Sequence, residues 1–139
     1  MAEKAGKKYI LHHKEKGLWR IQACKDFRYV FGYVKKGEFG GLIESEKNLS
    51  HDGNCWVADN AMVFGNAIVY DNAGVSGNAY VYDNARVYGN AWIYDNANVL
   101  ENALVYDNAR VLDNAWVREN AKVYGYARIY DDAIIYDNA

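Results

Sequence analysis

Aliphatic residues recur at every sixth position over the C-terminal part of the chain. Val or Ile stands at all fourteen positions of a six-residue register that begins at Val57 and ends at Ile135. An Ala follows four residues after each of them, from Ala61 to Ala139, and the residue before that Ala is Asn in all but two units. The repeating unit is therefore Val-Tyr-(Asp/Gly)-Asn-Ala-x, in which x varies.

This six-residue period predicts one short β-strand and one corner per unit. Successive side chains of a strand point to opposite faces, so the Ala and Val of Ala-x-Val-Tyr share one face and x and Tyr share the other. Asp, Gly and Asn are turn residues because they tolerate positive φ or bond the nearby backbone. An amphipathic helix is excluded, since its apolar period is close to 3.6. One unit cannot bury its two small apolar side chains alone, so the units are expected to coil and stack around an Ala/Val core.

The sequence upstream of the repeat predicts a second kind of structure. Two segments between residues 18 and 34 are rich in the β-branched and aromatic residues typical of strands. We expect a small β cap over residues 9–55, a solenoid over residues 56–139, and a disordered N-terminus over residues 1–8. The cap would cover the first coil, whose unpaired strand edges would otherwise invite aggregation.

The repeat resembles that of the hexapeptide-repeat proteins, which form left-handed parallel β-helices with three six-residue faces per 18-residue coil. A Tyr after the aliphatic residue departs from that family. A closer resemblance is to the YdcK-type β-solenoid proteins of bacteria and their phages, whose Asn-Ala-x-Val-Tyr repeats follow a lead-in similar to the stretch from Val34 to Leu49 and the Gly-Asn-Cys-Trp-Val run at 53–57. This resemblance covers residues 17–139. It implies an all-β fold, a three-sided parallel β-helix with a small N-terminal β cap. Left-handedness is implied by the resemblance alone, because parallel crossovers are generally right-handed.

Outward side chains are expected to form columns, because residue n lies over residue n+18 at about 4.8 Å in such a coil. One column consists of tyrosines alone. Stacked aromatic residues can simply stabilise adjacent strands, by ~0.2–1 kcal/mol a pair. The functional alternative is a flat surface that contacts a protein or stacks on sugars, since Tyr is enriched at interface hot spots. The candidate residues are Tyr70, Tyr88, Tyr106 and Tyr124.

The corner residues form columns as well, and two of these edges are strongly acidic. Residues 57–139 carry 11 Asp and Glu against 5 Lys and Arg, whereas residues 1–56 carry 7 against 11. One interpretation is that Asp suits turns. The alternative is a phage-type inhibitor that mimics nucleic-acid charge on a DNA- or RNA-handling protein. Direct binding of nucleic acid is not expected from an acidic rod. The candidate residues are Asp83, Glu101, Glu119 and Asp137.

Catalytic chemistry is not apparent in the chain. Hexapeptide acyltransferases resemble one another in a His near a coil junction, but this repeat contains no His, and the histidines stand upstream at His12, His13 and His51. No nucleophile elbow or phosphate loop is present. Cys24 and Cys55 match no metal or disulfide spacing. We expect no catalytic, cofactor-binding or metal site, with an acyltransferase-like protein as the alternative.

The expected function is that of a non-enzymatic scaffold that presents flat aromatic and acidic surfaces to a protein partner. A charged N-terminus and the lack of about 18 consecutive apolar residues favour a cytoplasmic protein with no membrane contact. The repeat continues to Ala139 without a cap. We therefore expect either a truncated chain or a partner or second copy that covers this end, the latter giving a homo-oligomer. A self-assembling structural element is a further alternative.

Overall fold

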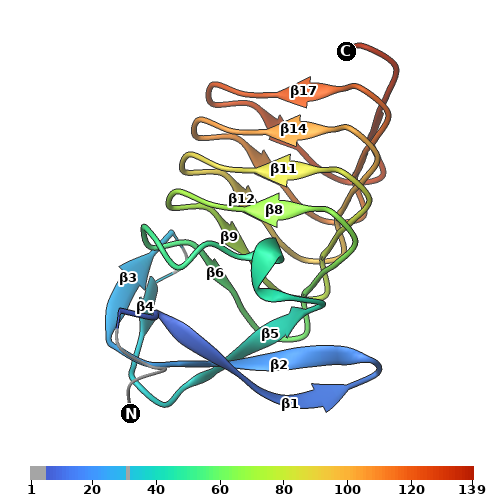
Figure 1. Cartoon of the computed structure of the whole chain (residues 1–139). Helices are drawn as coiled ribbons and strands as arrows, with labels where there is room; N and C mark the ends of the chain where they lie inside the picture. Colours follow the sequence, from blue (N-terminus) through green and yellow to red (C-terminus); the bar gives the residue numbers. More distant parts are fainter. Residues whose placement is uncertain (1–5, 31) are drawn as a thin grey trace.

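Stacks of two-residue strands make up the C-terminal part of the computed structural model, which describes residues 6–30 and 32–139 (Figure 1). Each strand consists of the variable residue x and the aliphatic residue of one repeat. The strands are β6 (Trp56–Val57), β7 (Met62–Val63), β8 (Ile68–Val69), β9 (Gly74–Val75), β10 (Tyr80–Val81), β11 (Arg86–Val87), β12 (Trp92–Ile93), β13 (Asn98–Val99), β14 (Leu104–Val105), β15 (Arg110–Val111), β16 (Trp116–Val117), β17 (Lys122–Val123), β18 (Arg128–Ile129) and β19 (Ile134–Ile135).

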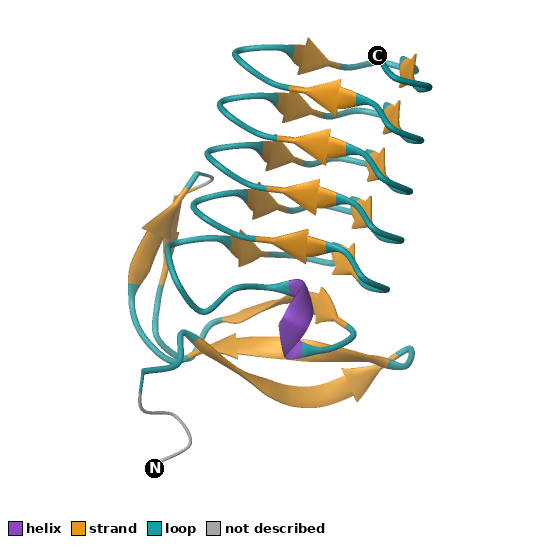
Figure 2. Cartoon of the chain, turned by 45° about the horizontal axis from the view of Figure 1, so that its top comes forward, coloured by secondary structure: helices purple, strands orange, loops and turns teal. Residues whose placement is uncertain are grey.

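Every third strand is hydrogen-bonded to the next in parallel register, which gives three stacks. The orders are β8-β11-β14-β17, β6-β9-β12-β15-β18 and β7-β10-β13-β16-β19. Val87, for example, pairs with Val69 on one side and Val105 on the other. The predicted all-β fold of parallel stacked coils, 18 residues each, is therefore confirmed (Figure 2). Its left-handedness stays a prediction.

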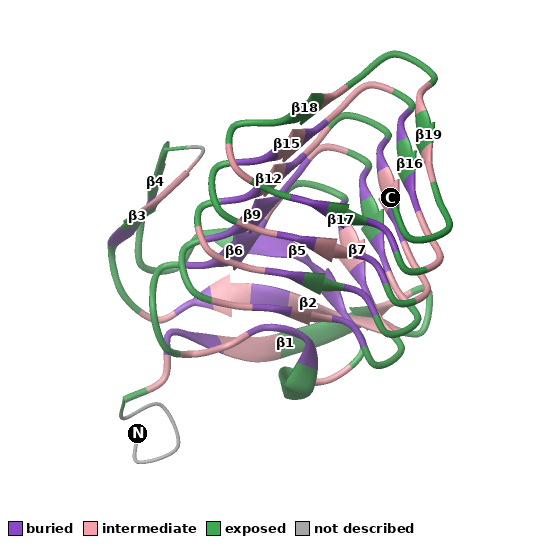
Figure 3. Ribbon diagram, turned by 90° about the horizontal axis from the view of Figure 1, so that it is seen from above, coloured by how far each residue is buried: buried purple, intermediate pink, exposed green. Residues whose placement is uncertain are grey.

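Repeat alanines and aliphatic residues form the core, as the two-face pattern predicts. The repeat Ala side chains from Ala61 to Ala121 and the aliphatic ones from Val57 to Val117 have no exposed surface. Burial declines in the last coil, where Ile129 and Ile135 are only half-buried (Figure 3). A core residue therefore needs a coil on both sides to be fully enclosed.

The residue after each outward-facing Tyr position turns the chain at a corner. Its backbone is left-handed, with φ between 55° and 58° at the acidic corner residues and close to 65° at Gly65, Gly77, Gly89 and Gly125. Asp and Gly are among the residues that tolerate this region. The N–H of the repeat Ala closes the turn by donating to the carbonyl three residues back, as Ala85 does to Tyr82 at 3.3 Å.

An antiparallel meander forms the base of the rod (Figure 1). Its strands are β1 (Tyr9–Glu15), β2 (Leu18–Ala23) and β5 (Phe39–Ile43), and a separate hairpin contains β3 (Phe27–Tyr29) and β4 (Gly32–Val34). Strand β5 pairs antiparallel with β2 and parallel with β7, so cap and solenoid share one eight-stranded sheet.

The first coil is irregular and begins before the predicted boundary at residue 56. Leu42 pairs with Met62, and Leu49 forms a bridge with Val69, so this coil is two residues longer than the others. The 3₁₀ turn η2 (Glu46–Asn48) occupies one of its corners. The part of the range 9–55 from β5 onward therefore belongs to the parallel coils, because it is hydrogen-bonded in parallel although it lacks the six-residue period.

Lys8 links the N-terminal segment to the first coil. Its side chain is fully buried, and Nζ donates to the carbonyl oxygens of Cys55 at 2.6 Å and Gly53 at 3.3 Å. Burial lowers the pKa of this amine. Of the segment 1–8 predicted to be disordered, residues 1–5 lie outside the described residues, but Lys8 is a fixed part of the core.

Within the described residues, no helix has the length and apolar character needed to cross a membrane.

Candidate binding surfaces

The four predicted tyrosines form one uninterrupted stack beside the β8-β11-β14-β17 sheet. Ring centroids of successive residues lie 4.8, 5.0 and 5.4 Å apart from Tyr70 to Tyr124, and the interplanar angles are 6°, 5° and 13°. The coil spacing of a β-solenoid is about 4.8 Å, so the rings stack without distortion of the backbone. We call these four residues the tyrosine column.

Stacking determines which part of each ring faces solvent. Tyr70, Tyr88 and Tyr106 are half-buried because each ring covers the face of its neighbour, whereas Tyr124 is 56% exposed. Ring edges and hydroxyl groups therefore make up most of the accessible surface of the column. Partial burial and the adjacent Tyr70 raise the pKa of Tyr88, so its hydroxyl is a neutral donor and acceptor at physiological pH.

A second column on the same sheet alternates between apolar and cationic side chains. Ile68 and Leu104 are half-buried, and Arg86 and Lys122 are exposed. Neither cation has an ion pair, because the four ion pairs among the described residues all lie between residues 7 and 51. The face thus combines aromatic edges, aliphatic groups and two unpaired positive charges.

The predicted acidic edge is also brought into register. The backbone N–H of Glu101 donates to Asp83 Oδ2 at 3.2 Å, that of Glu119 to Glu101 Oε1 at 3.0 Å, and that of Asp137 to Glu119 Oε1 at 2.7 Å. Asp83, Glu101 and Glu119 thereby each accept a hydrogen bond from the backbone N–H of the corner one coil further on. This bonding gives a structural reason for acidic corners, in agreement with the turn interpretation. Hydrogen bonding to Asp137 lowers the pKa of Glu119, and that of Asp137 is raised in return.

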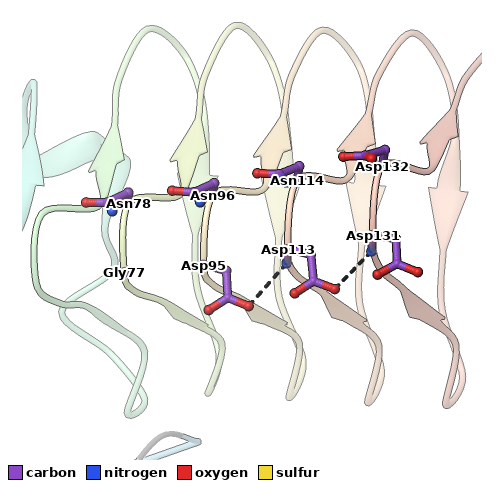
Figure 4. A pocket seen from close by; sticks show the side chains of 8 residues that line it. All are labelled: Gly77, Asn78, Asp95, Asn96, Asp113, Asn114, Asp131 and Asp132. Carbon is purple, nitrogen blue, oxygen red and sulfur yellow. Dashed lines mark hydrogen bonds between the residues drawn. The ribbon is translucent and has the colours of Figure 1, made fainter.

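A neighbouring edge repeats this arrangement along an open groove of about 650 Å³ (Figure 4). The N–H of Asp113 donates to Asp95 Oδ2 at 3.2 Å, and that of Asp131 donates to Asp113 Oδ2 at 3.0 Å.

Within residues 6–30 and 32–139, no three His, Cys, Asp or Glu side chains are grouped so that they could hold a metal ion.

The cap histidines are engaged in contacts within the cap. His51 stacks on Tyr9 at 4.1 Å between ring centroids, and its Nε2 lies 2.7 Å from Glu46 Oε1. His13 Nε2 lies 2.7 Å from Glu15 Oε2, and its Nδ1 lies 2.7 Å from Nδ1 of His12. These contacts use both ring nitrogens of His13.

One further concave surface was not singled out from the sequence. It is a groove of about 390 Å³ over β12, β15 and β18. In the sequence, the only sign of this groove is a pair of arginines one coil apart in the variable position x, Arg110 and Arg128. This sign is weak because x differs from coil to coil. The lining residues are Tyr94, Arg110, Leu112, Asp113, Arg128 and Tyr130.

Two segments of the chain match a family model described as the YdcK β-solenoid repeat. They comprise residues 79–95 and 103–119, and each is nearly one coil long. They include Tyr88 and Tyr106 of the tyrosine column and Asp83 and Glu119 of the acidic edge. No curated protein matches the chain.

Proposed function

Because the chain carries YdcK β-solenoid repeats, which stack into regular flat faces, we propose that it is a binding scaffold whose tyrosine column contacts a protein partner. The observation that carries this proposal is the continuous stack of four rings, 4.8 to 5.4 Å apart, on one face of the rod. A surface of this kind presents large amphipathic side chains that are already fixed in position.

Pre-ordering favours binding through these residues. Association normally costs about 0.5–1.5 kcal/mol for each side chain that becomes immobilised at the interface. The tyrosine rings are held by their neighbours before any partner arrives, so much of this entropy is already lost on folding. Tyr is moreover enriched among the residues that dominate interface energies.

The neighbouring column suggests the chemistry of the partner. Arg86 and Lys122 alternate with Ile68 and Leu104 along the same face. A complementary surface would place carboxylates opposite the two cations and apolar groups between them. Binding should therefore weaken as ionic strength rises, and association should slow more than dissociation accelerates.

Affinity capture from a lysate of the source organism, with matched variants as bait, tests this proposal. A partner of the column should be retained by the unaltered chain and lost with Tyr88→Ser/Tyr106→Ser. The matched control is Phe64→Ser/Tyr82→Ser, which removes an equivalent stack, 5.0 Å between ring centroids, from another face. Circular dichroism and thermal unfolding must show that both double variants fold. Equal loss of the partner with both would contradict a specific role of the tyrosine column.

The acidic edge supports a second candidate function, the occupation of a basic groove on a DNA- or RNA-handling protein. Its carboxylates recur once per coil, and backbone amides hold them in a common orientation. For this function, Glu101→Lys/Glu119→Lys should abolish salt-sensitive binding to a basic partner, whereas Tyr88→Ser/Tyr106→Ser should not. The opposite result would exclude the acidic edge and favour the column.

The acyltransferase-like alternative has its own test. Acetyl-CoA titrated into the full chain in a calorimeter should give no heat of binding if the protein is a scaffold. A micromolar dissociation constant would overturn the proposal.

Self-association stays a prediction, and light scattering over a range of concentrations would detect it.

A further inference from the structure

The sheet formed by β6, β9, β12, β15 and β18 changes character along the rod. Near the base its outer face is covered: Trp56 is fully buried and packs on Phe27 of the β3–β4 hairpin at 5.2 Å between ring centroids, and Gly74 and Ser76 are buried as well. The hairpin stands beside this end of the sheet (Figures 1 and 3). From β12 onward the face is open, and it forms the groove of about 390 Å³.

Two arginines occupy the centre of this groove. Arg110 and Arg128 are direct partners in the parallel pairing of β15 and β18, so their backbones lie one strand spacing, about 4.8 Å, apart. Like charges at paired positions of a sheet are destabilising. Neither guanidinium belongs to any of the four ion pairs among the described residues. Within residues 6–30 and 32–139, no carboxylate therefore forms an ion pair with either arginine.

The surroundings fix the arginines and add flat apolar surface. The guanidinium of Arg110 lies over the ring of Trp92, with its Cζ 4.8 Å from the ring centroid, and this contact holds the side chain in place. Tyr94 and Tyr130 stand two coils apart at the two ends, with Leu112 between them. Tyr130 is 55% exposed, so its ring is available for contact.

We propose that this groove binds a mononucleotide, with the phosphate on Arg110 and Arg128 and the base on Leu112 and Tyr130. A phosphomonoester carries a charge near −2 and three acceptor oxygens, which match two guanidinium groups, whereas a carboxylate is satisfied by one. Aromatic side chains stack on any base. The volume lies within the range of small-ligand sites.

The acidic corners limit the ligand to a short one. Asp113 lines the groove, and Asp95 and Asp131 continue the same edge above and below it. An extended polyanion that followed the arginines would approach these carboxylates and be repelled. A single phosphate with one attached ring avoids them.

Calorimetric titration of the full chain with AMP, GMP, CMP and UMP tests the assignment, with inorganic phosphate, adenosine and phosphotyrosine as comparison ligands. At least one mononucleotide should bind about ten-fold more tightly than phosphate or adenosine. Arg128→Gln should weaken that binding about ten-fold or more, as loss of a charge-assisted hydrogen bond predicts. Tyr130→Ser should reduce mononucleotide affinity toward that of phosphate without changing phosphate binding.

Arg86→Gln is the matched control, because Arg86 is an exposed arginine in the same position of the repeat on another sheet. It should leave mononucleotide affinity unchanged. Equal weakening by Arg86→Gln and Arg128→Gln would reveal non-specific attraction and overturn the proposal. Mononucleotides that bind no better than phosphate, or no binding at millimolar ligand, would also overturn it. Tighter binding of phosphotyrosine than of every mononucleotide would reject the nucleotide in favour of a phosphorylated protein segment.

Discussion

A single residue at each corner sets the geometry of its coil. At Asp95 the backbone φ is 56°, and Oδ2 accepts the N–H of Asp113 at 3.2 Å. The side chain thus meets two demands at once, since it tolerates the left-handed conformation and satisfies an amide of the next coil.

Substitutions at Asp95 should separate these two demands. Asp95→Ala has neither property and should lower the free energy of unfolding by about 2 kcal/mol, the sum of a left-handed Ala and a lost hydrogen bond. Asp95→Gly should cost about 1 kcal/mol, because Gly adopts the left-handed backbone without strain but cannot accept the hydrogen bond from Asp113. Asp95→Asn keeps both and should cost least. Urea unfolding measures the series, and an Ala variant as stable as the Asn variant would contradict this account.

Glu15 gives the cap a pH dependence. Hydrogen bonds from Arg20, and then from His13, lower its pKa from about 4.5 to about 2. A carboxylate whose pKa is lowered on folding stabilises the native state above the unfolded value, and this contribution is lost as the pH falls toward the folded value. The melting temperature of the unaltered chain should therefore exceed that of Glu15→Gln at pH 6, and the two should converge between pH 4.5 and 2. A constant difference across this range would contradict the assignment.

The first coil shows how one element is fixed where the repeat is absent. Asn48 of η2 is fully buried, its Oδ1 accepts the N–H groups of Glu44 and Ser45, and its Nδ2 donates to the carbonyls of Ala67 at 2.8 Å and Gly65 at 3.2 Å. The two bonds accepted by Oδ1 hold the irregular corner itself, and the two donated by Nδ2 connect it to the regular coil that follows.

Replacement of this amide by a carboxylate should weaken the junction between cap and solenoid. Asn48→Asp places an acceptor against two carbonyl oxygens and should lower the free energy of unfolding by about 3 kcal/mol, since buried polar groups left unpaired cost about 1–3 kcal/mol each. Asn102→Asp is the matched control, because Asn102 is exposed and its side chain donates one hydrogen bond, at 3.3 Å, to Asn120 Oδ1. Its cost should stay below about 0.5 kcal/mol. Similar costs at both positions would show that the buried network does not hold the junction.

The parts of the structure that could be predicted from the sequence are those that follow from the six-residue repeat. Val57 and its successors could be assigned to the core because every sixth residue is aliphatic, and the tyrosine column followed from a fixed coil length. Lys8 and Asn48 could not be foreseen, since their partners are backbone carbonyls of other coils and leave no pattern in the sequence. The groove over β12, β15 and β18 was missed because only two of its three coils carry an arginine in position x.

The whole rod is stabilised by contacts between neighbouring coils, so position along it should determine the cost of a core substitution. Ile93 and Ile129 occupy the same column of the repeat, but Ile93 is fully buried and Ile129 is only half-buried. Ile93→Val should cost about 1 kcal/mol, as in well-packed cores. Ile129→Val should cost less than half of that. Equal values from urea unfolding would argue against nearest-neighbour stabilisation.

The eight-stranded sheet shared by cap and solenoid has a consequence for biosynthesis. A ribosome adds about 5–20 residues each second, so a new 18-residue coil emerges every ~1–4 s. A β-hairpin forms in about 1–10 μs, far faster than a coil is synthesised. Since β5 is paired with β2 of the cap on one edge and offers its other edge to β7, the part made first is already a template when the first repeat leaves the exit tunnel. Each later coil can then dock as it appears, so the chain is expected to fold in the direction in which it is translated.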